Sequence, residues 1–242
     1  MKSILLCWLF SALVPCIACS QTKINKSYPV KQGQTVTFRF DYPKTIRVSS
    51  WNKNEISVEA SVKIDGAVAD SVFTLLQSEA NGRLLIENKL DINKIPNRYY
   101  VVENGIKTRF NTKEDMNAFI KEKGRSVTSN YQTQDVEIII DIKLPANINT
   151  EISSVYGMVE VQDFKGPMKI DATYGGIDAK LNHQLIGKLK MTNRFGKIYT
   201  NLSLKPNELK EERFFTAITA TPGQGPSYDF SSSYGNIYLR NP

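Results

Sequence analysis

The sequence predicts an all-β protein, a solenoid-like or β-helix-like stack of short strands with about 20 residues in each repeat. Three observations predict this fold. Apolar and polar residues alternate along most of the chain, which is typical of half-buried strands. An aromatic-glycine unit with fixed apolar spacing recurs four times in the C-terminal half. Each unit has room for two short strands and cannot bury its apolar face alone. An antiparallel sandwich or jelly roll is the alternative architecture.

The N-terminal residues 1–18 have the features of a secretory signal peptide. Lys2 precedes an apolar stretch over residues 4–14, which is too short to span a bilayer as a mature helix. Two processing sites are open. Cleavage before Cys19 would leave a lipid-modified amino terminus, and this site resembles a bacterial lipobox. Cleavage before Gln21 would release an unmodified chain.

Residues 19–242 are expected to form one β-repeat domain without disulfides. All three cysteines, Cys7, Cys16 and Cys19, lie in or next to the signal peptide, so core burial must hold the exported chain together. The net charge of +7 is spread over the chain without a long run of like charges. Because no basic and aromatic RNA-binding pattern is present, we expect no nucleic-acid partner.

Strands are expected first in the N-terminal half. Residues 34–64, 84–90 and 135–145 place apolar side chains at every second position. Pro43 and Gly82 lie between or beside these runs and indicate turns.

Residues 94–132 interrupt this pattern and predict an inserted β-hairpin followed by one helix. Asn104-Gly105 is the strongest two-residue hairpin signal, and it places Tyr100 opposite Arg109. The helix is expected to begin after Thr112, a residue suited to capping, and to end at Gly124. Its narrow apolar stripe is expected to pack on the β body.

The corner unit is an aromatic residue followed by glycine. Its copies are Tyr156-Gly157, Tyr174-Gly175, Phe195-Gly196 and Tyr234-Gly235. Two residues after the glycines come the apolar residues Val159, Ile177, Ile198 and Ile237. Five residues before them come Ile152, Ile170, Met191 and Phe230. The spacing predicts strand, corner and strand, stacked at about 4.8 Å with like residues in contact and the aromatic rings in a ladder.

Glycine is expected at each corner because a side chain would clash there or because the turn needs a positive φ. Gly175→Val should therefore lower the melting temperature. The copies are spaced by 18, 21 and 39 residues. Because the last interval is about twice the others, a degenerate copy is expected near residues 212–223. The amino-terminal strands and the Arg240-Asn241-Pro242 tail are the candidate caps for the open ends of the stack.

A family resemblance rests on three of these elements. The motifs S-x-Y-G-x-V, T-Y-G-G-I and S-Y-G-N-I, behind a secretory signal, resemble the bacterial β-strand-repeat family of putative adhesins of unknown function. The likeness covers residues 34–66 and 135–242, and the segment 94–132 has no counterpart in it. The resemblance implies an exported β-helical stack in the bacterial envelope and supplies no catalytic residues.

Outward positions beside the corners form a candidate ligand face. Its members are Glu160, Asp178, Lys180, Tyr199, Asn201, Tyr238 and Arg240. Such an array of tyrosines, amides and charges could contact a sugar chain or an extended peptide, although any solvated strand face has a similar composition. Paired carboxylates could ligate Ca²⁺ or act as acid and base, but calcium needs more oxygen ligands. We expect Lys180 to neutralise the two carboxylates instead.

No catalytic centre, metal site or cofactor site is expected. His183 is the single histidine, and no nucleophile-elbow, zinc or phosphate-loop motif occurs. The predicted function is therefore a non-enzymatic cell-envelope protein, an adhesin or interaction scaffold. Its expected location is the outer membrane as a lipoprotein, the periplasm or the cell surface of a Gram-negative bacterium.

Two alternative functions remain open. The first is a glycan-binding or polysaccharide-active β-helix protein that uses the tyrosine-bearing outer face. The second is an envelope sensing or structural protein that docks a partner through residues 94–132. The expected partner is an envelope protein or a glycan, with membrane contact only through a lipid anchor at Cys19.

Overall fold

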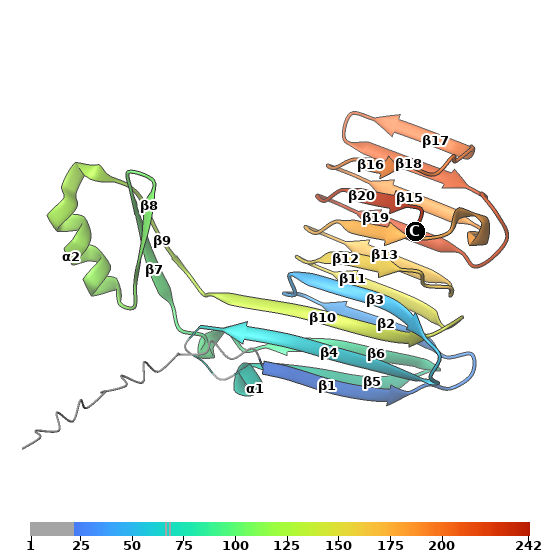
Figure 1. Cartoon of the computed structure of the whole chain (residues 1–242), viewed down its shortest axis with the longest axis horizontal. Helices are drawn as coiled ribbons and strands as arrows, with labels where there is room; N and C mark the ends of the chain where they lie inside the picture. The colour runs from blue at the N-terminus through green and yellow to red at the C-terminus, as the bar shows by residue number, and fades with distance from the viewer. Residues whose placement is uncertain (1–21, 66, 68) are drawn as a thin grey trace, which may run out of the picture.

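The computed structural model describes residues 22–65, 67 and 69–242 of the chain. The expected signal peptide, Cys19 and both processing sites lie outside these residues. Strands make up most of the described chain and form two large sheets and one small sheet (Figure 1). The prediction of an all-β protein is confirmed.

The two large sheets, called sheet A and sheet B, have eight and nine strands. Sheet A contains, in spatial order, β1 (Thr22–Pro29), β4 (Glu55–Ile64), β10 (Val136–Pro145), β3 (Thr45–Trp51), β12 (Met158–Gln162), β14 (Ile177–Lys180), β20 (Ile237–Arg240) and β16 (Ile198–Thr200). Sheet B contains, in spatial order, β17 (Pro206–Glu212), β18 (Phe215–Ala220), β15 (Leu189–Asn193), β19 (Tyr228–Ser232), β13 (Met168–Ala172), β11 (Asn149–Ser154), β2 (Thr35–Phe40), β6 (Arg83–Leu90) and β5 (Phe73–Ala80).

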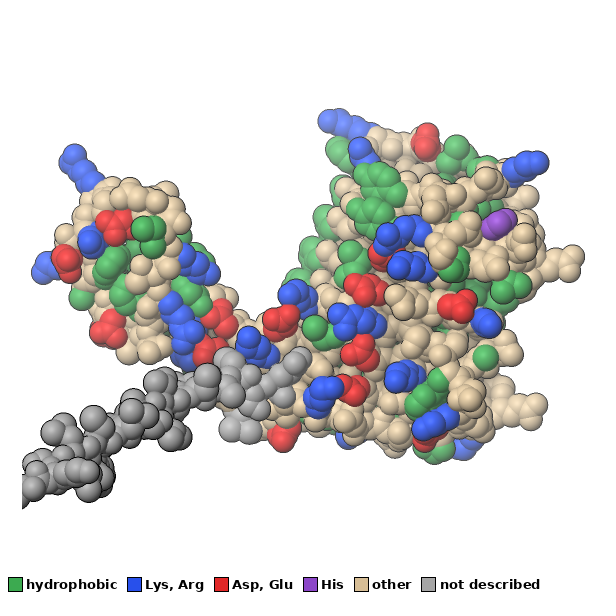
Figure 2. Space-filling model, in the orientation of Figure 1, with side chains coloured by type: hydrophobic (Ala, Val, Ile, Leu, Met, Phe, Trp, Pro, Cys, Tyr) green, Lys and Arg blue, Asp and Glu red, His purple; other side chains and the backbone are tan. Residues whose placement is uncertain are grey.

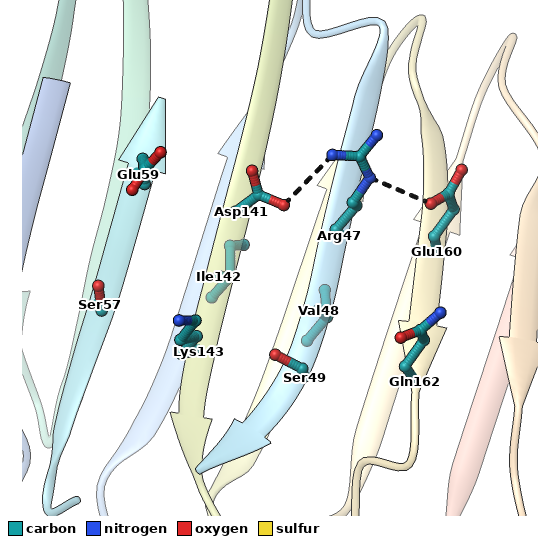
Figure 3. A pocket seen from close by; sticks show the side chains of 10 residues that line it. All are labelled: Arg47, Val48, Ser49, Ser57, Glu59, Asp141, Ile142, Lys143, Glu160 and Gln162. Carbon is teal, nitrogen blue, oxygen red and sulfur yellow. Dashed lines mark ion pairs between the residues drawn. The ribbon is translucent and has the colours of Figure 1, made fainter. Parts of the chain in front are cut away.

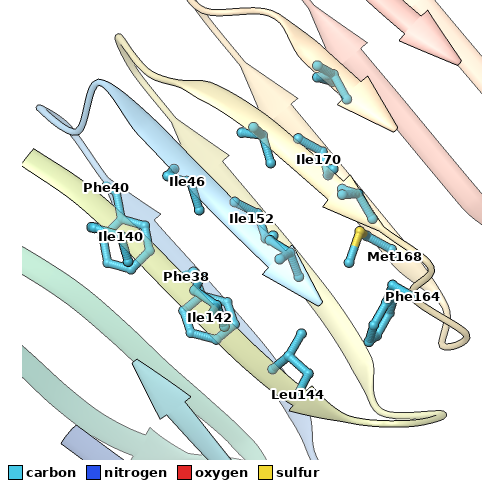
Figure 4. Close-up of a cluster of buried hydrophobic side chains, with 14 of the residues drawn as sticks. Phe38, Phe40, Ile46, Ile140, Ile142, Leu144, Ile152, Phe164, Met168 and Ile170 are labelled. Atoms are coloured by element: carbon cyan, nitrogen blue, oxygen red, sulfur yellow. The ribbon is translucent and has the colours of Figure 1, made fainter. Parts of the chain in front are cut away.

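The two large sheets lie face to face and enclose one apolar core. Alternate side chains of most strands point inward, as Phe38 and Phe40 do from β2 and Ile140 and Ile142 do from β10 (Figure 4). All four are fully buried or nearly so. The N-terminal alternation predicted from the sequence therefore builds the same core as the C-terminal repeats.

Each corner unit connects the two sheets. The chain leaves a strand of sheet B, turns at the aromatic-glycine pair and enters a strand of sheet A. Equivalent residues of neighbouring units pair in parallel, as Ile152 does with Ile170 and Val159 with Ile177. This is the register that the apolar spacing predicted.

The units do not stack in chain order. β19 lies between β13 and β15 in sheet B, and β20 lies between β14 and β16 in sheet A. The last copy, Tyr234-Gly235, is therefore inserted between the second and third copies. The expectation that the C-terminal tail caps an open end is wrong, because β20 is paired on both sides.

The expected degenerate copy is not a copy of the unit. β18 runs antiparallel to both β15 and β17, whereas the true copies run parallel. The polar insertion before it forms β17, and the two strands make a hairpin through Arg213-Phe214. This hairpin closes one end of sheet B.

A short helix, α1 (Ala69–Val72), closes the other end of the body. It packs against β1, β4 and β5. The remaining short helical turns on this body are η1 (Ile92–Lys94) and η3 (His183–Leu185).

The inserted segment forms a separate small body, called the module, beside the two-sheet body (Figure 1). Its sheet has the order β8 (Ile106–Phe110), β7 (Arg98–Glu103) and β9 (Val127–Thr133). The hairpin has the predicted pairing of Tyr100 with Arg109, and both turn residues have positive φ, 50° at Asn104 and 81° at Gly105. The third strand was not predicted.

Helix α2 (Lys113–Lys123) has the predicted caps. The hydroxyl of Thr112 accepts a hydrogen bond from the amide of Asp115, and Gly124 ends the helix before η2 (Gly124–Ser126). The helix packs against β7 and β8, and the ring centroids of Phe119 and Phe110 lie 5.2 Å apart. The expectation that its apolar stripe packs on the β body is therefore wrong, because the stripe covers the module's own hairpin.

Candidate functional site

The corner glycines lie against the backbone of neighbouring corners. A Cβ atom on Gly175 would collide with the carbonyl oxygen of Gly157, and one on Gly235 with that of Gly175. A Cβ atom on Gly196 would collide with the carbonyl oxygen of Gly235. None of these glycines has a positive φ. Of the two reasons that the sequence allowed, close approach of the backbone is the correct one.

Small buried polar side chains hold the corners from inside. The hydroxyl of Ser232 accepts a hydrogen bond of 3.1 Å from the amide of Gly235. The side chain of Asn193 accepts from the amide of Gly196 at 2.6 Å and donates to the carbonyl of Gly235 at 2.7 Å. Ser154 makes the equivalent contact in the first copy. The sequence analysis missed these residues, although a polar residue three positions before glycine is a usable signal.

Six aromatic rings form one ladder along the corners, which we call the aromatic ladder. In spatial order they are Tyr42, Tyr156, Tyr174, Tyr234, Phe195 and Phe214. Neighbouring ring centroids lie 4.9 to 6.1 Å apart, and the residues are 44 to 57% exposed. Hydrophobic side chains gather along the edge of the two-sheet body that is nearer the module (Figure 2). The four corner rings were predicted to stack; the two end rings were not.

Stacking determines which part of each ring a ligand can reach. The inner rings are nearly parallel, with 12° between Tyr156 and Tyr174 and 10° between Phe195 and Tyr234. Each inner ring therefore covers the faces of its neighbours and exposes its edge. Ring edges carry partial positive charge, whereas ring faces carry partial negative charge. The aromatic ladder thus offers C–H edges and tyrosine hydroxyls to the solvent.

The predicted ligand face lies on the outer side of sheet A, where its charges pair with one another. Glu160 and Asp178 are direct cross-strand neighbours. The carboxylate of Glu160 lies 3.4 Å from Arg47, and that of Asp178 accepts from Arg240 Nε at 3.1 Å. The expectation that Lys180 neutralises both is wrong, because arginines from β3 and β20 occupy that role among the described residues.

The two tyrosines of this face are stacked on each other. The ring centroids of Tyr199 and Tyr238 lie 5.1 Å apart with an angle of 11° between them. Tyr199 is on β16, the edge strand, so Tyr238 covers one face of its ring and no further strand of sheet A lies beyond the other face. The side chain of Asn201 accepts from the amide of Asn241 at 3.0 Å. The predicted face therefore comes together in space, but most of its polar groups have protein partners.

A polar groove of about 420 Å³ crosses the same outer face at β4, β10, β3 and β12 (Figure 3). Arg47 lies in its centre, 3.6 Å from a carboxylate oxygen of Asp141 and 3.4 Å from one of Glu160. The ligand face as predicted from the sequence included only Glu160 of this groove. Apart from Gln162, which also lies on β12, the other residues come from strands outside the repeat, which only the folded sheet brings beside it.

The module joins the two-sheet body through a cluster around Asp65. The carboxylate of Asp65 binds both Arg98 and Arg109 at 2.7 Å. The hydrogen bond from Arg98 holds the pKa of Asp65 below its ordinary value of 3.8, against the opposing effect of burial. The hydroxyl of Tyr100 donates to Asp135, and that bond together with burial raises the pKa of Tyr100. Sequence patterns gave no signal for this cluster.

Other site chemistry is scarce in the part of the chain that the structure describes. No group of three or more histidine, cysteine, aspartate or glutamate side chains there could hold a metal ion. No helix among the same residues is long and apolar enough to cross a membrane. His183 lies in η3, with its Nδ1 atom 3.3 Å from the side-chain oxygen of Asn241.

Comparisons with known proteins find no family and only two weak structural likenesses. No family model and no curated protein matches the chain. It is similar to a putative cell adhesion protein from Clostridium sporogenes, with 9% identity, 92% of this chain and 100% of that one covered, and a TM-score of 0.46. It is also similar to a putative adhesin from Bacteroides fragilis, with 10% identity, 91% and 98% coverage, and a TM-score of 0.21. Likenesses this weak carry no argument about the present chain.

Proposed function

We propose that this chain is a non-enzymatic interaction scaffold of the adhesin type, exported to the envelope of a Gram-negative bacterium. Its β-helix-like stack holds a recognition surface in a fixed geometry, and no residue is assigned a catalytic role. The signal features of residues 1–18 support export, and Cys19 is the proposed lipid anchor. An envelope protein or glycan is the proposed partner.

The aromatic ladder is the observation that carries this proposal. Its six rings are among the large hydrophobic residues that stay exposed although the core is well filled. A contiguous exposed apolar strip on a soluble body marks an interaction surface more often than chance. The corner glycines and the buried Ser232 and Asn193 hold this strip rigid, so binding would cost little ordering of side chains.

The test removes the centre of the aromatic ladder. Tyr174→Ala combined with Tyr234→Ala should lower the retention of the purified exported chain on envelope fragments by about tenfold, because buried aromatic contacts dominate most interfaces. Tyr199→Ala combined with Tyr238→Ala removes a stacked pair outside the ladder and serves as the matched control. Retention that is unchanged in the first variant, or reduced only in the control, would reject the ladder as the binding surface.

Docking through the module is the second candidate function. The module lies beside the two-sheet body and is joined to it by the Asp65 cluster. At the tip of its hairpin, Ile106 is 70% exposed. An apolar side chain at the tip of a held hairpin is suited to inserting into a partner's pocket. Replacing residues 98–133 by a short glycine-serine linker should abolish retention if this candidate is correct and leave it intact if the aromatic ladder alone binds. The melting curve of the shortened chain shows whether the two-sheet body has stayed folded.

A further inference from the structure

The copies of the corner unit differ in charge at the positions that flank the aromatic-glycine pair. In three copies these positions are neutral: Val155 and Met158, Thr173 and Gly176, Ser233 and Asn236. In the third copy along the chain they are Arg194 and Lys197. The next ring of the aromatic ladder, Phe214, follows Arg213. Three cations therefore gather at one end of the ladder.

These three cations are exposed, and no ion pair joins them to a carboxylate among the described residues. The guanidinium carbon of Arg213 lies 4.9 Å from the ring centroid of Phe214. By contrast, Lys44, two residues after Tyr42 at the other end of the ladder, pairs with Glu137 at 2.9 Å. Positive charge that is left unpaired beside positive ring edges favours an anionic ligand.

The backbone of the corners is not available to a ligand. The amide of Tyr174 donates to the carbonyl of Val155 at 2.7 Å, and that of Tyr234 donates to Thr173 at 2.9 Å. The amide of Phe195 donates to Ser233 at 2.8 Å. Since these bonds run from one corner to the next, a peptide strand cannot add to this surface through main-chain pairing. Recognition must use phenol hydroxyls, ring edges and cations.

We propose that the aromatic ladder binds an acidic polysaccharide, with the carboxylate or phosphate groups of the polymer on Arg194, Lys197 and Arg213. This inference rests on the proposed function and names the ligand class of the same surface. The ladder is one ring wide and roughly 24 Å long at about 4.8 Å for each strand. A linear polymer fits such a strip. Its hydroxyls meet the hydroxyls of Tyr156, Tyr174 and Tyr234, and its anionic groups meet the cationic end.

A flat anionic surface fits less well. β17 lies at the same end of the body and carries Glu208, Glu211 and Glu212, all exposed. Lys210 pairs with Glu212 at 2.9 Å, whereas no ion pair involves the other two among the described residues. A lipid bilayer would approach these carboxylates together with the cations and be repelled by them. A narrow polymer can contact the corner alone.

The experiment measures binding of polygalacturonate to the exported chain by isothermal titration calorimetry. Arg194→Gln combined with Lys197→Gln should weaken binding by about tenfold, because each exposed charge contact is worth a factor of a few. Lys165→Gln combined with Lys188→Gln removes two exposed lysines from the edge of the body opposite the corners and should change affinity less than twofold. Raising the salt concentration should weaken the wild type more than the Arg194/Lys197 variant.

Parallel titrations use dextran, polyglutamate and equimolar phosphatidylglycerol–phosphatidylcholine vesicles. The proposal is overturned if the control variant loses as much affinity as the test variant. It is also overturned if polyglutamate or the vesicles bind more tightly than polygalacturonate. If polygalacturonate does not bind but Tyr174→Ala with Tyr234→Ala still lowers retention on envelope fragments, the ligand class is wrong and the scaffold function stands. If neither measurement responds, both are wrong.

Discussion

At Gly175 the obstacle to a side chain is backbone, which cannot move aside as a flexible side chain can. The carbonyl oxygen of Gly157 belongs to a corner that is itself paired on both sides. Gly33 is different, since its φ of 74° is left-handed and nothing lies within 4 Å of an added Cβ atom. Glycine is therefore required for close approach of the backbone at Gly175 and for a positive φ at Gly33.

Gly175→Ala should lower the free energy of unfolding by about 3 kcal/mol, because one added methyl forces two corners apart. Gly33→Ala, the matched control, should cost only about 1 kcal/mol through its φ. Urea denaturation of both variants gives the two values. Equal costs at the two positions would contradict the assignment of the corner glycines to close packing.

Residue by residue, the sequence predicted the positions that repeat and missed those that do not. The glycines and the inward apolar residues obey one spacing, so four copies reinforce one another. The position three residues before the glycine is polar in three copies, but in the second copy it is alanine, Ala172, which weakens the pattern. The prediction that Lys180 neutralises Asp178 was wrong for another reason. Arg240 reaches it only because β20 pairs with β14, a neighbour that lies far along the chain.

Among the elements, the module shows how an insertion can be held in place by few residues. Asp65 follows β4, Arg98 begins β7, and Arg109 lies on β8. One carboxylate thus ties both strands of the hairpin to the two-sheet body. The side chain of Arg98 is only 11% exposed, so solvent weakens this contact less than it weakens the surface pairs.

Asp65→Asn should loosen this joint without unfolding the sheets. Because the folded-state pKa of Asp65 lies below its ordinary value of 3.8, its contribution is fully present above that pH. The contribution is lost as the pH falls through the lower folded-state value. Near neutral pH, amide exchange in β7 and β9 should be about fivefold faster in the variant, consistent with the loss of a modest ion pair.

Glu59→Gln is the control, because it removes the exposed pair with Lys23 at 2.7 Å between β4 and the edge strand β1 and touches no residue of the Asp65 cluster. Exchange in the module should not respond to it. Unchanged exchange in Asp65→Asn near neutral pH, or a difference that grows instead of vanishing at acid pH, would contradict the role given to Asp65.

The helix of the module also marks a limit of pattern reasoning. Its caps at Thr112 and Gly124 were predicted because capping depends on local residues. The surface on which the helix packs was not predicted, because an apolar stripe indicates that the helix is buried on one side but not which element buries it. Met116 is buried, and the helix contacts the two hairpin strands β7 and β8, which a narrow apolar stripe is sufficient to cover.

For the whole molecule, the stacking of the units was predictable and their order was not. All four corners present nearly the same glycine, aromatic ring and inward side chains, so each could sit beside any other. The interval of 39 residues between the last two copies fits two periods of a regular stack as well as a hairpin excursion. Only the long-range pairing of the strands distinguishes the two arrangements, and a repeat pattern carries no information about that pairing.

One end of the stack shows how the body limits uncontrolled edge pairing. β17, at one edge of sheet B, is fully exposed and carries several charges, and β16, at one edge of sheet A, has only three residues. Charged and very short edge strands are common devices against aggregation. The proposed recognition surface runs along the corners and ends at the β17–β18 turn, beside this edge.

The insertion of the last copy between two earlier ones has a consequence for how the chain matures. β15 and β16 pair with β19 and β20, which follow them in the chain, and they are not neighbours of β13 and β14 in the sheet order. β15 and β16 therefore lack their parallel partner strands until residues 228–240 have been made. A chain that stops before Tyr228 would lose strands from the middle of its stack rather than from its end, so the two neighbouring units would have to close a gap or stay apart.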